Sequence, residues 1–468
     1  MKYIADIGLE IHAQLITERK LFGSSENAFA AEPNFLTDNY NLGMPGMLPV
    51  LNKAATEKAL TAALALECNI NRKTYFDRKN YFYYDLPKGY QITQYYTPLG
   101  KNGVVELASG KKIRIERIHI EEDSGKSVYK NGEIFIDYNR CGVPLIEIVT
   151  YPEMHSGDEA SEFMRELKNI LVLLGLNTGD LQKGSLRCDA NVSVRKETSD
   201  ELGVKTEIKN INSFRFVKQA VDHEIKRQIE IKKNDGEIER ETRTYDEKLK
   251  KTRLLRKKED TNDYRYFREP DLKPLIFSDE HIKKQRIELP ELPQELRSGL
   301  KEKYKLDSKK IEYLINNVEH LKKFSSYSKV FVREEEIEKF NKIYFDSLKH
   351  LTEAGKVIDP EYLKGIISLL LGEEISASSA SKLIEVCTNE GISPQEAVDK
   401  HNMRLVKDKE ILTKWINEAI ENNPETYERY KKGRKNLSGF FIGQVMKKSK
   451  GKADPNLLKS LIIEMLEN

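Results

Sequence analysis

The spacing of apolar residues changes once along this chain, and that change constrains the fold most strongly. Up to about residue 290, many short stretches alternate apolar with polar residues, as strands do when one face lies on a core. In 3–15 every odd position is apolar, and Glu10, His12 and Gln14 share the opposite face. From about residue 293 the apolar positions recur every three or four residues, which predicts helices only. We therefore expect an α+β chain in which an antiparallel sheet precedes an all-helical part.

Local signals place several elements in the first part. The apolar phase slips within 113–122, which predicts a β-bulge near Arg117. Ser156 and Ser213 precede stripes of apolar residues at helical spacing, so each is expected to begin a helix. The charge-rich segment 231–275 is expected to be a long exposed hairpin or loop.

The length of 468 residues suits roughly two to four domains. The helical part breaks near 402–409, and Asp454 with Pro455 is expected to start the last helix as its N-cap and first residue. These breaks predict three domains, which span residues 1–292, 293–406 and 407–468.

Composition argues against several classes of protein. No apolar run approaches about 18 residues, so no transmembrane helix is expected, and the N-terminus does not resemble a signal peptide. The four cysteines form no Cys-x-x-Cys pair, which argues against a disulfide framework and a cysteine-rich zinc site and indicates a reducing, cytoplasmic location. The net charge is only +3, so affinity for nucleic acid must come from local clusters.

Carboxylates and an imidazole gather on the predicted strands. Glu147 stands within the apolar run 145–149, where a carboxylate is costly unless it is paired or bound to a metal. Oxygen ligands with one imidazole suit Mg²⁺ or Mn²⁺. The alternative is a solvated strand face, and His119 is expected to be structural. The candidate metal ligands, all of which except Glu121 are also catalytic candidates, are Glu10, His12, Glu121, Glu122 and Glu147.

Sites for phosphate and for nucleophiles are less marked. The chain has no P-loop and no Gly-x-Gly-x-x-Gly after a strand, so a nucleotide would need another type of site. Cys188 alternates with core residues and no Gly-x-Ser-x-Gly elbow occurs, so the chain is not expected to hydrolyse an amide by itself. The basic candidates for phosphate contacts are Arg140, Arg187, Lys205 and Lys209.

Basic residues cluster near the C-terminus. Residues 429–459 hold ten basic side chains and one acidic side chain, which gives 10 − 1 = +9. Such a cluster in a small helical unit favours contact with a nucleic-acid backbone over a merely solvated face. The tyrosine-rich run 81–84 either stacks bases or belongs to the core. The candidate nucleic-acid ligands are Lys431, Lys432, Arg434, Lys435, Lys447, Lys448, Lys450 and Lys452.

Ordered blocks of sequence over nearly the whole chain point to one family. The most specific block is 135–149, which reads FIDYNRCGVPLIEIV. This block resembles the GatB family, the B subunits of glutamyl/aspartyl-tRNA amidotransferases. Further blocks that resemble the family are 7–12, 78–83, 85–91, 119–123, 187–193, 206–210, 263–267, 443–446 and 450–453. Within these blocks, the additional candidates for binding phosphate or substrate are Lys79, Lys88, Asp189 and Glu207.

The resemblance implies an architecture and a reaction. The sheet domain would be the family's antiparallel cradle, followed by a helical domain and a small helical tail of the YqeY kind. The chain would work in a heterotrimer with an amidase (glutaminase) partner, which releases ammonia from glutamine, and with a small linking partner. It would use ATP and Mg²⁺ to phosphorylate the side-chain carboxylate of Glu on tRNA(Gln) or Asp on tRNA(Asn), and ammonia would then give the amide. The alternative is a tRNA-binding scaffold without its own catalytic site.

The chain departs from the family pattern at two places. Many members hold zinc with two pairs of cysteines in the first domain, whereas 31–51 contains no cysteine here, so no zinc is expected. The usual proline after Tyr-Arg-Tyr-Phe is replaced by Arg268, which affects only the expected local turn.

Overall fold

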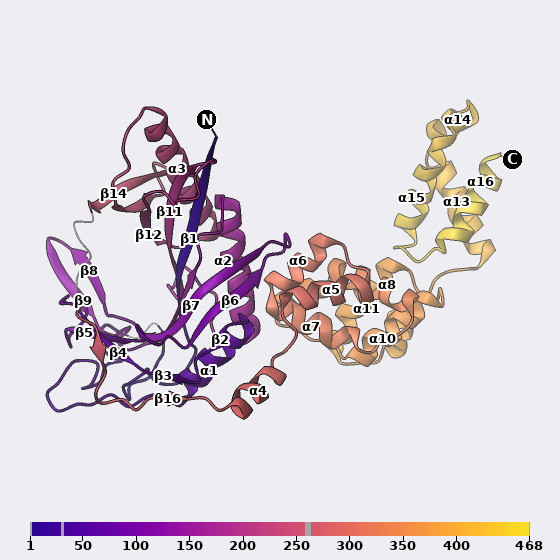
Figure 1. The fold of residues 1–468 in the computed structure, drawn as a ribbon. Coiled ribbons are helices and arrows are strands. Elements are labelled where there is room, and N and C mark those ends of the chain that lie inside the picture. Colours follow the sequence, from indigo (N-terminus) through magenta and orange to yellow (C-terminus); the bar gives the residue numbers. More distant parts are fainter. Residues whose placement is uncertain (1, 30–31, 258–263, 468) are drawn as a thin grey trace. The chain divides into compact units, whose positions relative to one another are not determined.

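The computed structural model describes residues 2–29, 32–257 and 264–467, and Figure 1 shows their fold. The chain forms two compact units, Met1–Leu296 and Arg297–Asn468. The expected α+β class is confirmed, because the strands belong to the first unit and the second unit is helical. Among the described residues, no helix combines the length and the hydropathy needed to cross a membrane.

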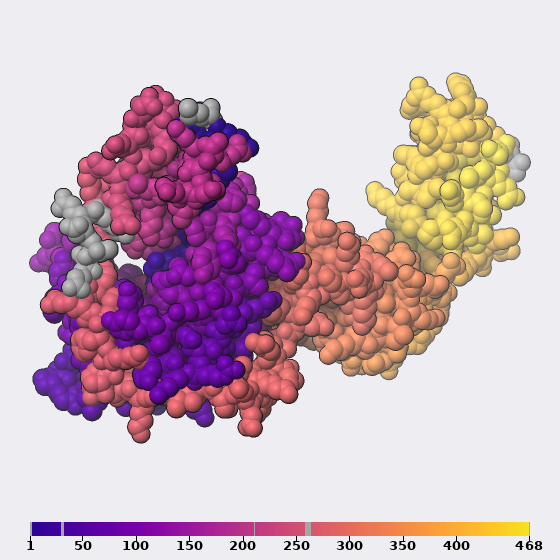
Figure 2. Space-filling view, in the orientation of Figure 1, coloured from indigo at the N-terminus to yellow at the C-terminus, as the bar shows by residue number. Residues whose placement is uncertain are grey.

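A nine-stranded sheet organises the described part of the first unit, with the order β14-β13-β12-β11-β1-β10-β7-β6-β2. Its strands are β1 (Tyr3–Gln14), β2 (Asn69–Ile70), β6 (Gly100–Glu106), β7 (Lys112–Glu122), β10 (Pro144–Thr150), β11 (Leu186–Lys196), β12 (Thr206–Ile211), β13 (Glu241–Asp246) and β14 (Lys251–Lys257). Figure 2 shows that early (indigo) and later (pink) residues of this unit form one continuous body.

One pair of strands corrects the expectation of a wholly antiparallel sheet. Within the described residues, β12 and β13 run parallel, whereas all other neighbours in the large sheet run antiparallel. Helix α3 (Phe214–Lys233) lies between β12 and β13 in the sequence. A helical crossover returns the chain to the same end of the sheet, so the next strand runs in the same direction.

The core covers the face of β1 that carries the odd-numbered residues, as expected. Ile7, Leu9 and Ile11 are each at most 1% exposed. Helices α2 (Gly157–Leu173) and α3 pack against each other, and α3 packs against β11. Glu10 and His12, on the opposite face of β1, are only half-buried and remain available for chemistry.

The two predicted helix starts are confirmed by their capping hydrogen bonds. The hydroxyl of Ser156 accepts a hydrogen bond from the backbone N–H of Glu159 at 3.2 Å. The hydroxyl of Ser213 accepts one from the N–H of Phe216 at 3.1 Å. Each bond satisfies a donor that the first turn of a helix otherwise leaves unpaired.

The predicted bulge is also present. Val149 in β10 pairs with Arg117 in β7, whereas the next residue, Thr150, pairs with Ile115. The ladder therefore skips Glu116, and the extra residue restores the apolar phase of β7. Beyond the bulge, the even residues of β7 face the core, and His119 and Glu121 face the same side as the polar face of β1.

The segment 231–275 is only partly an exposed hairpin. β13 and β14 form an antiparallel hairpin, but this hairpin also extends the main sheet through β12. Thr242 is 0% exposed, so β13 contributes to the interior. Residues 258–263 of the segment lie outside the described residues.

Shorter elements border the large sheet. The short strands pair as β15 (Phe267–Arg268) with β4 (Asp77–Asn80), β4 with β5 (Tyr90–Thr93), β16 (Leu275–Ile276) with β3 (Lys73–Thr74), and β8 (Lys126–Lys130) with β9 (Glu133–Asp137). The remaining helices of this unit are α1 (Lys53–Ala65) and α4 (Asp279–Ile287).

The second unit is helical, as the spacing of its apolar residues predicts. Its helices are α5 (Pro293–Tyr304), which begins just before the unit boundary, α6 (Ser308–Asn316), α7 (Val318–Ser328), α8 (Glu334–Ile343), a π-helical turn (Tyr344–Leu348), α9 (Lys349–Glu353), α10 (Pro360–Leu371), α11 (Ala377–Glu390), α12 (Pro394–Lys400), α13 (Lys409–Glu421), α14 (Pro424–Lys431), a 3-10 turn (Lys435–Leu437), α15 (Ser438–Lys448) and α16 (Pro455–Glu467). The three-domain division at 292/293 and 406/407 stays a prediction.

The last four helices, α13–α16, share a hydrophobic cluster that includes Leu412, Phe441 and Leu458, all 0% exposed. The start of α16 confirms the expected N-cap. The Asp454 carboxylate accepts hydrogen bonds from the N–H groups of Asn456 at 3.0 Å and of the following residue at 2.9 Å.

Candidate active site

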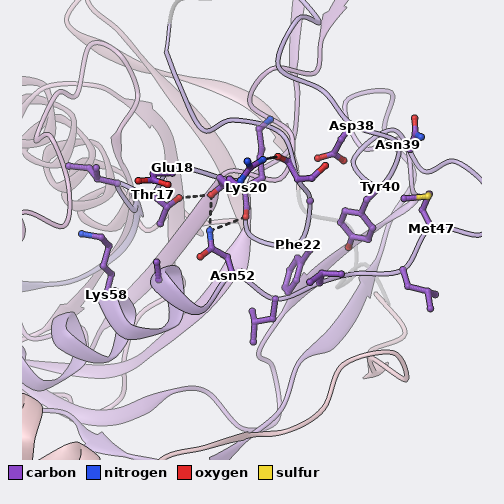
Figure 3. Close-up of a pocket in the computed structure, with 18 residues that line it drawn as sticks. Thr17, Glu18, Lys20, Phe22, Asp38, Asn39, Tyr40, Met47, Asn52 and Lys58 are labelled. Atoms are coloured by element: carbon purple, nitrogen blue, oxygen red, sulfur yellow. Dashed lines mark hydrogen bonds between the residues drawn. The ribbon is translucent and has the colours of Figure 1, made fainter.

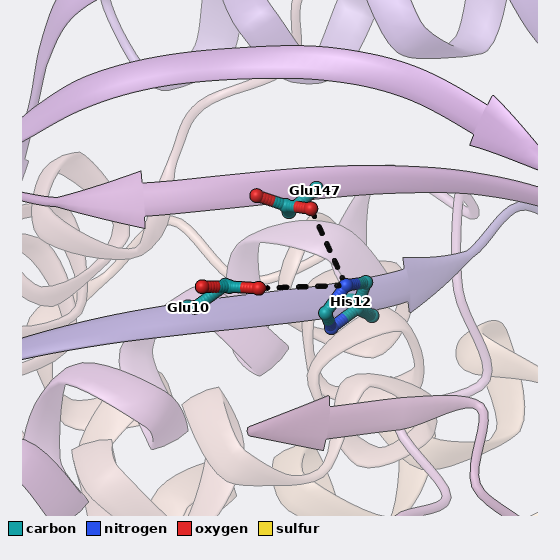
Figure 4. Close-up of side chains that lie close together, drawn as sticks. All are labelled: Glu10, His12 and Glu147. Carbon is teal, nitrogen blue, oxygen red and sulfur yellow. Dashed lines mark ion pairs between the residues drawn. The ribbon is translucent and has the colours of Figure 1, made fainter. Parts of the chain in front are cut away.

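One row of the sheet brings together two histidines and a glutamate. His12 in β1 pairs with Glu147 in β10, and Glu147 pairs in turn with His119 in β7. Residues that oppose each other across a sheet point to the same face, so these side chains meet on it. Figure 4 shows Glu147 facing Glu10 and His12 from the adjacent strand.

The distances in this group suit a divalent cation. Nε2 of His12 lies 3.4 Å from carboxylate oxygens of both Glu121 and Glu147, and Glu10 is 4.0 Å away. Nε2 of His119 lies 3.5 Å from Glu121 and 3.4 Å from Glu147. These separations are long for hydrogen bonds. They approach the spacing of about 3 Å between neighbouring ligands around Mg²⁺, which binds oxygen at about 2.1 Å.

Two overlapping sets of possible ligands result. Within the described part of the chain, Glu10, His12 and Glu147 form one set, and His119, Glu121 and Glu147 form the other, each with ligand atoms no more than 4.8 Å apart. We call these five residues the acid–histidine cluster. The structure thus brings together four of the five predicted metal ligands and adds His119, which the sequence analysis regarded as structural.

Without a cation, the two histidines balance the charge of the carboxylates. Burial would lower the pKa of His12, but its contact with Glu147 and the charge of Glu121 outweigh burial and raise the pKa to about 9. Burial likewise opposes the attraction of Glu147 on His119, whose pKa is also raised to about 9. Burial would raise the pKa of Glu147, yet the imidazoles hold it well below its usual value. A divalent cation would replace the two imidazolium protons as counter-charge.

The structure does not place Glu122 in this cluster, which corrects the sequence analysis. Its two carboxylate oxygens each lie 2.6 Å from Nζ of Lys88, and one accepts a hydrogen bond from the Ile92 N–H at 3.0 Å. Consecutive strand residues point to opposite faces, so Glu122 and Glu121 diverge. Both partners of the Lys88–Glu122 pair are buried, with side-chain exposures of 3% and 1%. Lys88 is therefore engaged by a carboxylate and does not stand free for a phosphate.

Two predicted phosphate ligands instead surround a buried carboxylate. Arg187 donates to Asp123 at 2.8 Å, and Nε of Arg140 lies 3.5 Å from the same carboxylate. Arg140 also donates to the backbone oxygens of Ser124 at 3.0 Å and Gly125 at 2.6 Å. Burial would raise the pKa of Asp123, but these guanidinium groups lower it. Both arginines thus support the loop after β7.

The candidates on β11 and β12 lie beside Glu10. Asp189 pairs with Glu10 across the sheet, and Lys209 reaches Asp189 at 2.7 Å and Glu207 at 3.1 Å. Burial opposes these attractions, which nevertheless raise the pKa of Lys209. Lys205 is exposed at the start of β12 and apart from this ion-pair group. The sheet thus extends a charged row from the acid–histidine cluster towards β12.

A cavity of about 580 Å³ opens beside the acid–histidine cluster. Glu10, Glu121 and Glu147 form part of its wall, together with the side chains of Lys79 and Lys101. Carboxylates that can hold a cation and ammonium groups that can hold phosphate therefore face one space. This is the arrangement expected of a site for phosphoryl transfer.

A larger cavity, of about 1070 Å³, lies elsewhere in the first unit and is mainly apolar (Figure 3). Lys20 at its wall is 1% exposed and donates hydrogen bonds to the backbone oxygens of Leu36 at 3.0 Å, Cys141 at 2.7 Å and Asn139. Its ammonium group is thus used to fix three segments of chain. We therefore locate the chemistry at the smaller, polar cavity.

The basic candidates near the C-terminus lie at the surface, but two of them have acidic partners. Lys448 forms an ion pair with Glu418 of α13, and Lys435 lies 3.5 Å from Glu467 of α16. These partners lie outside residues 429–459 and lower the effective charge of the basic surface. The other candidates, exposed or half-buried, are Lys431, Lys432, Arg434, Lys447, Lys450 and Lys452.

Reasoning from the sequence missed three side chains at the site. His119 shares a strand face with Glu121, two residues further on, and that spacing was a usable signal once the bulge was placed. Tyr95 and Tyr266 line the same cavity. Their contact joins segments 171 residues apart (266 − 95), so no local pattern announces it.

A sheet with an acid–histidine row, followed by helices, matches a known class of catalytic subunit. The GatB/GatE catalytic domain matches residues 5–283, and the GatB domain matches residues 341–466. The chain is 44% identical to the B subunit of the aspartyl/glutamyl-tRNA(Asn/Gln) amidotransferase of Thermodesulfovibrio yellowstonii, with all of both chains covered. It is 41% identical to that of Persephonella marina, again with both chains covered completely, and 42% identical to that of Geobacillus thermodenitrificans, with 99% of each chain covered. The chain therefore belongs to the GatB family of amidotransferase B subunits.

Proposed function

We propose that this chain is the transamidating subunit of a glutamine-dependent tRNA amidotransferase. Family membership supports a role in tRNA-dependent amide formation and the use of ATP. The finer proposal is that the chain phosphorylates the side-chain carboxylate of Glu on tRNA(Gln), of Asp on tRNA(Asn), or of both. The observation that carries it is the acid–histidine cluster at the wall of a cavity that also contains lysine side chains.

The chemistry explains why such a reaction needs a phosphoryl donor. Ammonia does not displace oxide from a carboxylate, whereas phosphate is a good leaving group. A carboxylate oxygen of the aminoacyl group first forms a bond to the γ-phosphorus of ATP, and the bond to the ADP oxygen breaks. Ammonia then attacks the acyl carbon, phosphate leaves with the electron pair of the C–O bond, and the nitrogen loses a proton. The transfer requires positioning and neutralisation of charge more than covalent help from the protein.

The residues of the acid–histidine cluster fit a magnesium ion. Glu10, Glu121 and Glu147 offer hard oxygen ligands, and the two histidines offer one nitrogen each. Bound there, Mg²⁺ would supply charge neutralisation for the transferred phosphoryl group. Lys79 and Lys101 would hold phosphate oxygens from the same cavity.

The ammonia is proposed to come from an amidase partner, joined in a heterotrimer by a small linking partner. All four cysteines, each in the described part of the chain, are buried and free. Burial raises the pKa of Cys141 to about 12 and that of Cys188 well above its usual value, so neither is an activated thiolate. We place the complex in the cytoplasm, where thiols stay reduced. The basic surface of α14–α16 is proposed to hold the tRNA.

The test is an amidation assay on the assembled enzyme with Glu-tRNA(Gln) and Asp-tRNA(Asn). We expect ATP-dependent formation of Gln-tRNA or Asn-tRNA, and ammonium chloride should replace glutamine when the partner amidase is inactivated. The isolated chain should release no glutamate from glutamine. Steady glutaminase activity of the pure chain, or amide formation without consumption of ATP, would contradict the proposal.

The basic surface favours a second candidate, a scaffold that only binds tRNA. Glu10→Ala distinguishes the two functions, because Glu10 belongs to the cluster and lies on the sheet, in the first unit. A catalytic subunit should lose amide formation and keep its affinity for tRNA, whereas a scaffold should keep both. Glu133→Ala, at an exposed position of β9, is the matched control.

A further inference from the structure

Two tyrosines stack at the wall of the cavity that holds the acid–histidine cluster. The rings of Tyr95 and Tyr266 are nearly parallel, with an interplanar angle of 9° and centroids 3.9 Å apart. Both line the 580 Å³ cavity together with Glu10 and Glu147. Tyr95 is 57% exposed and the adjacent Tyr96 is 51% exposed. An aromatic surface left open beside charged groups is typical of a ligand site and not of a core.

The backbone around the stack is held firmly. The buried carboxylate of Asp77 accepts hydrogen bonds from the N–H groups of Tyr95 at 2.8 Å and Tyr96 at 3.1 Å. The Tyr96 hydroxyl donates to the backbone oxygen of Tyr266 at 3.1 Å. Asn80 donates to the backbone oxygen of Arg265 at 2.8 Å, where the chain adopts a left-handed turn with φ of 43°. The two rings are thus positioned before any ligand arrives, which reduces the entropy lost on binding.

Cationic side chains stand next to these rings. The ammonium group of Lys79 lies 4.9 Å from the ring centroid of Tyr264 and 5.7 Å from that of Tyr81. Tyr264 in turn contacts Tyr266 edge-on, with centroids 6.0 Å apart. Lys79 and Lys101 both line the cavity, and neither has a carboxylate within ion-pair distance among the described residues. The cavity therefore combines a flat aromatic surface, ammonium groups and carboxylates, the chemistry that suits the base, the phosphates and the cation of a nucleotide.

We propose that an adenine ring stacks on the Tyr95–Tyr266 pair, with its phosphates near Lys79 and Lys101. This inference rests on the proposed function, whose two substrates, ATP and aminoacyl-tRNA, both carry an adenosine, at one end of the nucleotide and at the 3′ end of the tRNA. Stacking of a base on an aromatic ring is strong enough that its loss weakens binding about tenfold or more.

The test compares nucleotide binding by Tyr95→Leu, Tyr95→Phe and the wild-type full chain in the presence of Mg²⁺. The probes are a non-hydrolysable ATP analogue and inorganic tripolyphosphate, which lacks a base, with affinity measured by calorimetry. We expect Tyr95→Leu to weaken the ATP analogue about tenfold and to leave tripolyphosphate unchanged, whereas Tyr95→Phe retains the ring and stays near wild type. Tyr129→Leu, at a 73% exposed tyrosine of the β8–β9 hairpin outside the cavity, is the matched control.

A second arm identifies the source of the adenine. The assembled enzyme is titrated with intact tRNA and with tRNA that lacks its 3′-terminal adenosine. If the terminal adenosine occupies the stack, Tyr95→Leu should abolish the difference between the two tRNAs and leave the affinity for the ATP analogue unchanged. Either pattern supports an adenine site, and the arm that responds names the ligand.

Unchanged affinities in both arms would overturn the inference. An equal loss for the ATP analogue and tripolyphosphate would also overturn it, because the tyrosines would then only support the cation and phosphate groups. Failure of the proposed function looks different: the wild-type enzyme would bind the ATP analogue in a Tyr95-dependent manner and yet form no phosphorylated aminoacyl-tRNA. A wild-type chain that binds neither the ATP analogue nor the terminal adenosine would overturn both.

Discussion

The carboxylate of Glu147 lies 3.4 Å from Nε2 of His12, the residue that it opposes across the β1–β10 ladder. On its other side Glu147 opposes His119, again at 3.4 Å. All three positions lie inside strands, so the geometry depends on sheet hydrogen bonds and not on loop conformation. Sites built on regular elements hold their groups more exactly in place than sites on loops do.

Replacement of Glu147 by Gln should remove the one carboxylate that both ligand sets share. We expect the affinity of the full chain for Mg²⁺ to fall by at least about tenfold, since even partners outside the coordination sphere cost 10–100-fold. Calorimetric titration with Mg²⁺ provides the measurement. Glu133→Gln, on the exposed β9 strand, should bind Mg²⁺ as wild type does. Equal affinities of Glu147→Gln and wild type would show that the cluster is an ion-pair network only.

Removal of either partner of the buried Lys88–Glu122 pair should destabilise the first unit. Glu122→Gln leaves the Lys88 ammonium without a carboxylate, which typically costs about 3–5 kcal/mol. Hydrogen exchange of β5 and β7 amides is the suitable measurement, because the single tryptophan, Trp415, lies in α13.

The double variant Lys88→Met with Glu122→Gln should lose less stability than the sum of the two single variants. That result is the signature of a direct pair. Additive losses would mean that Lys88 and Glu122 act independently, contrary to the 2.6 Å contact.

The protein should contain no structural zinc. A hydrogen-bonded aspartate holds the loop where many relatives carry cysteines: Asp38 accepts bonds from the N–H groups of Ser25 and Asn41, each at 2.8 Å. Elemental analysis of the purified chain should give zinc well below one equivalent. Zinc that is stoichiometric and resists a chelator would refute this expectation.

The thiols should react slowly with iodoacetamide until the chain unfolds. Burial raises the pKa of Cys68 to about 12 and that of Cys387 to about 11. A raised pKa means less thiolate at any pH below it, and the thiolate is the reactive form. In the folded chain the rate should therefore still rise about tenfold per pH unit between pH 8 and 10, whereas in urea it should level off above about pH 8.5. A native rate that levels off near pH 8.5 would contradict the buried environment.

Neutralisation of Lys447, Lys448, Lys450 and Lys452 to Gln should raise KM for aminoacyl-tRNA and change kcat little. The slope of log affinity against log salt should become shallower by about three and not four, because Lys448 already pairs with Glu418. Kinetics across a salt series give both quantities.

The matched control for this surface neutralises four exposed lysines of α5–α8 and the loop after α7: Lys301, Lys322, Lys329 and Lys342. It should leave the salt slope near the wild-type value. An unchanged KM with a collapsed kcat in the tail variant would instead mean that the tail orders the active site.

Much of the local structure could be predicted, because its causes are local. The buried face of β1 follows from strict alternation, and the helix starts at Ser156, Ser213 and Asp454 follow from side chains that cap the first turn. The bulge near Arg117 followed from a shift of the apolar phase within one strand. The parallel run of β12 and β13 was missed, because the direction of a strand depends on its connection and not on its own residues.

The sequence by itself determined which side chains share a strand face, and thus the pairing of Glu10 with His12 and the link to the family. Only the tertiary structure decided how those faces meet. Glu121 joins the cluster while its neighbour Glu122 turns to Lys88, since adjacent residues of a strand point to opposite sides. Which strands become neighbours is a matter of long-range hydrogen bonding, so the meeting of His12, Glu147 and His119 was decided by the order of β1, β10 and β7 in the sheet.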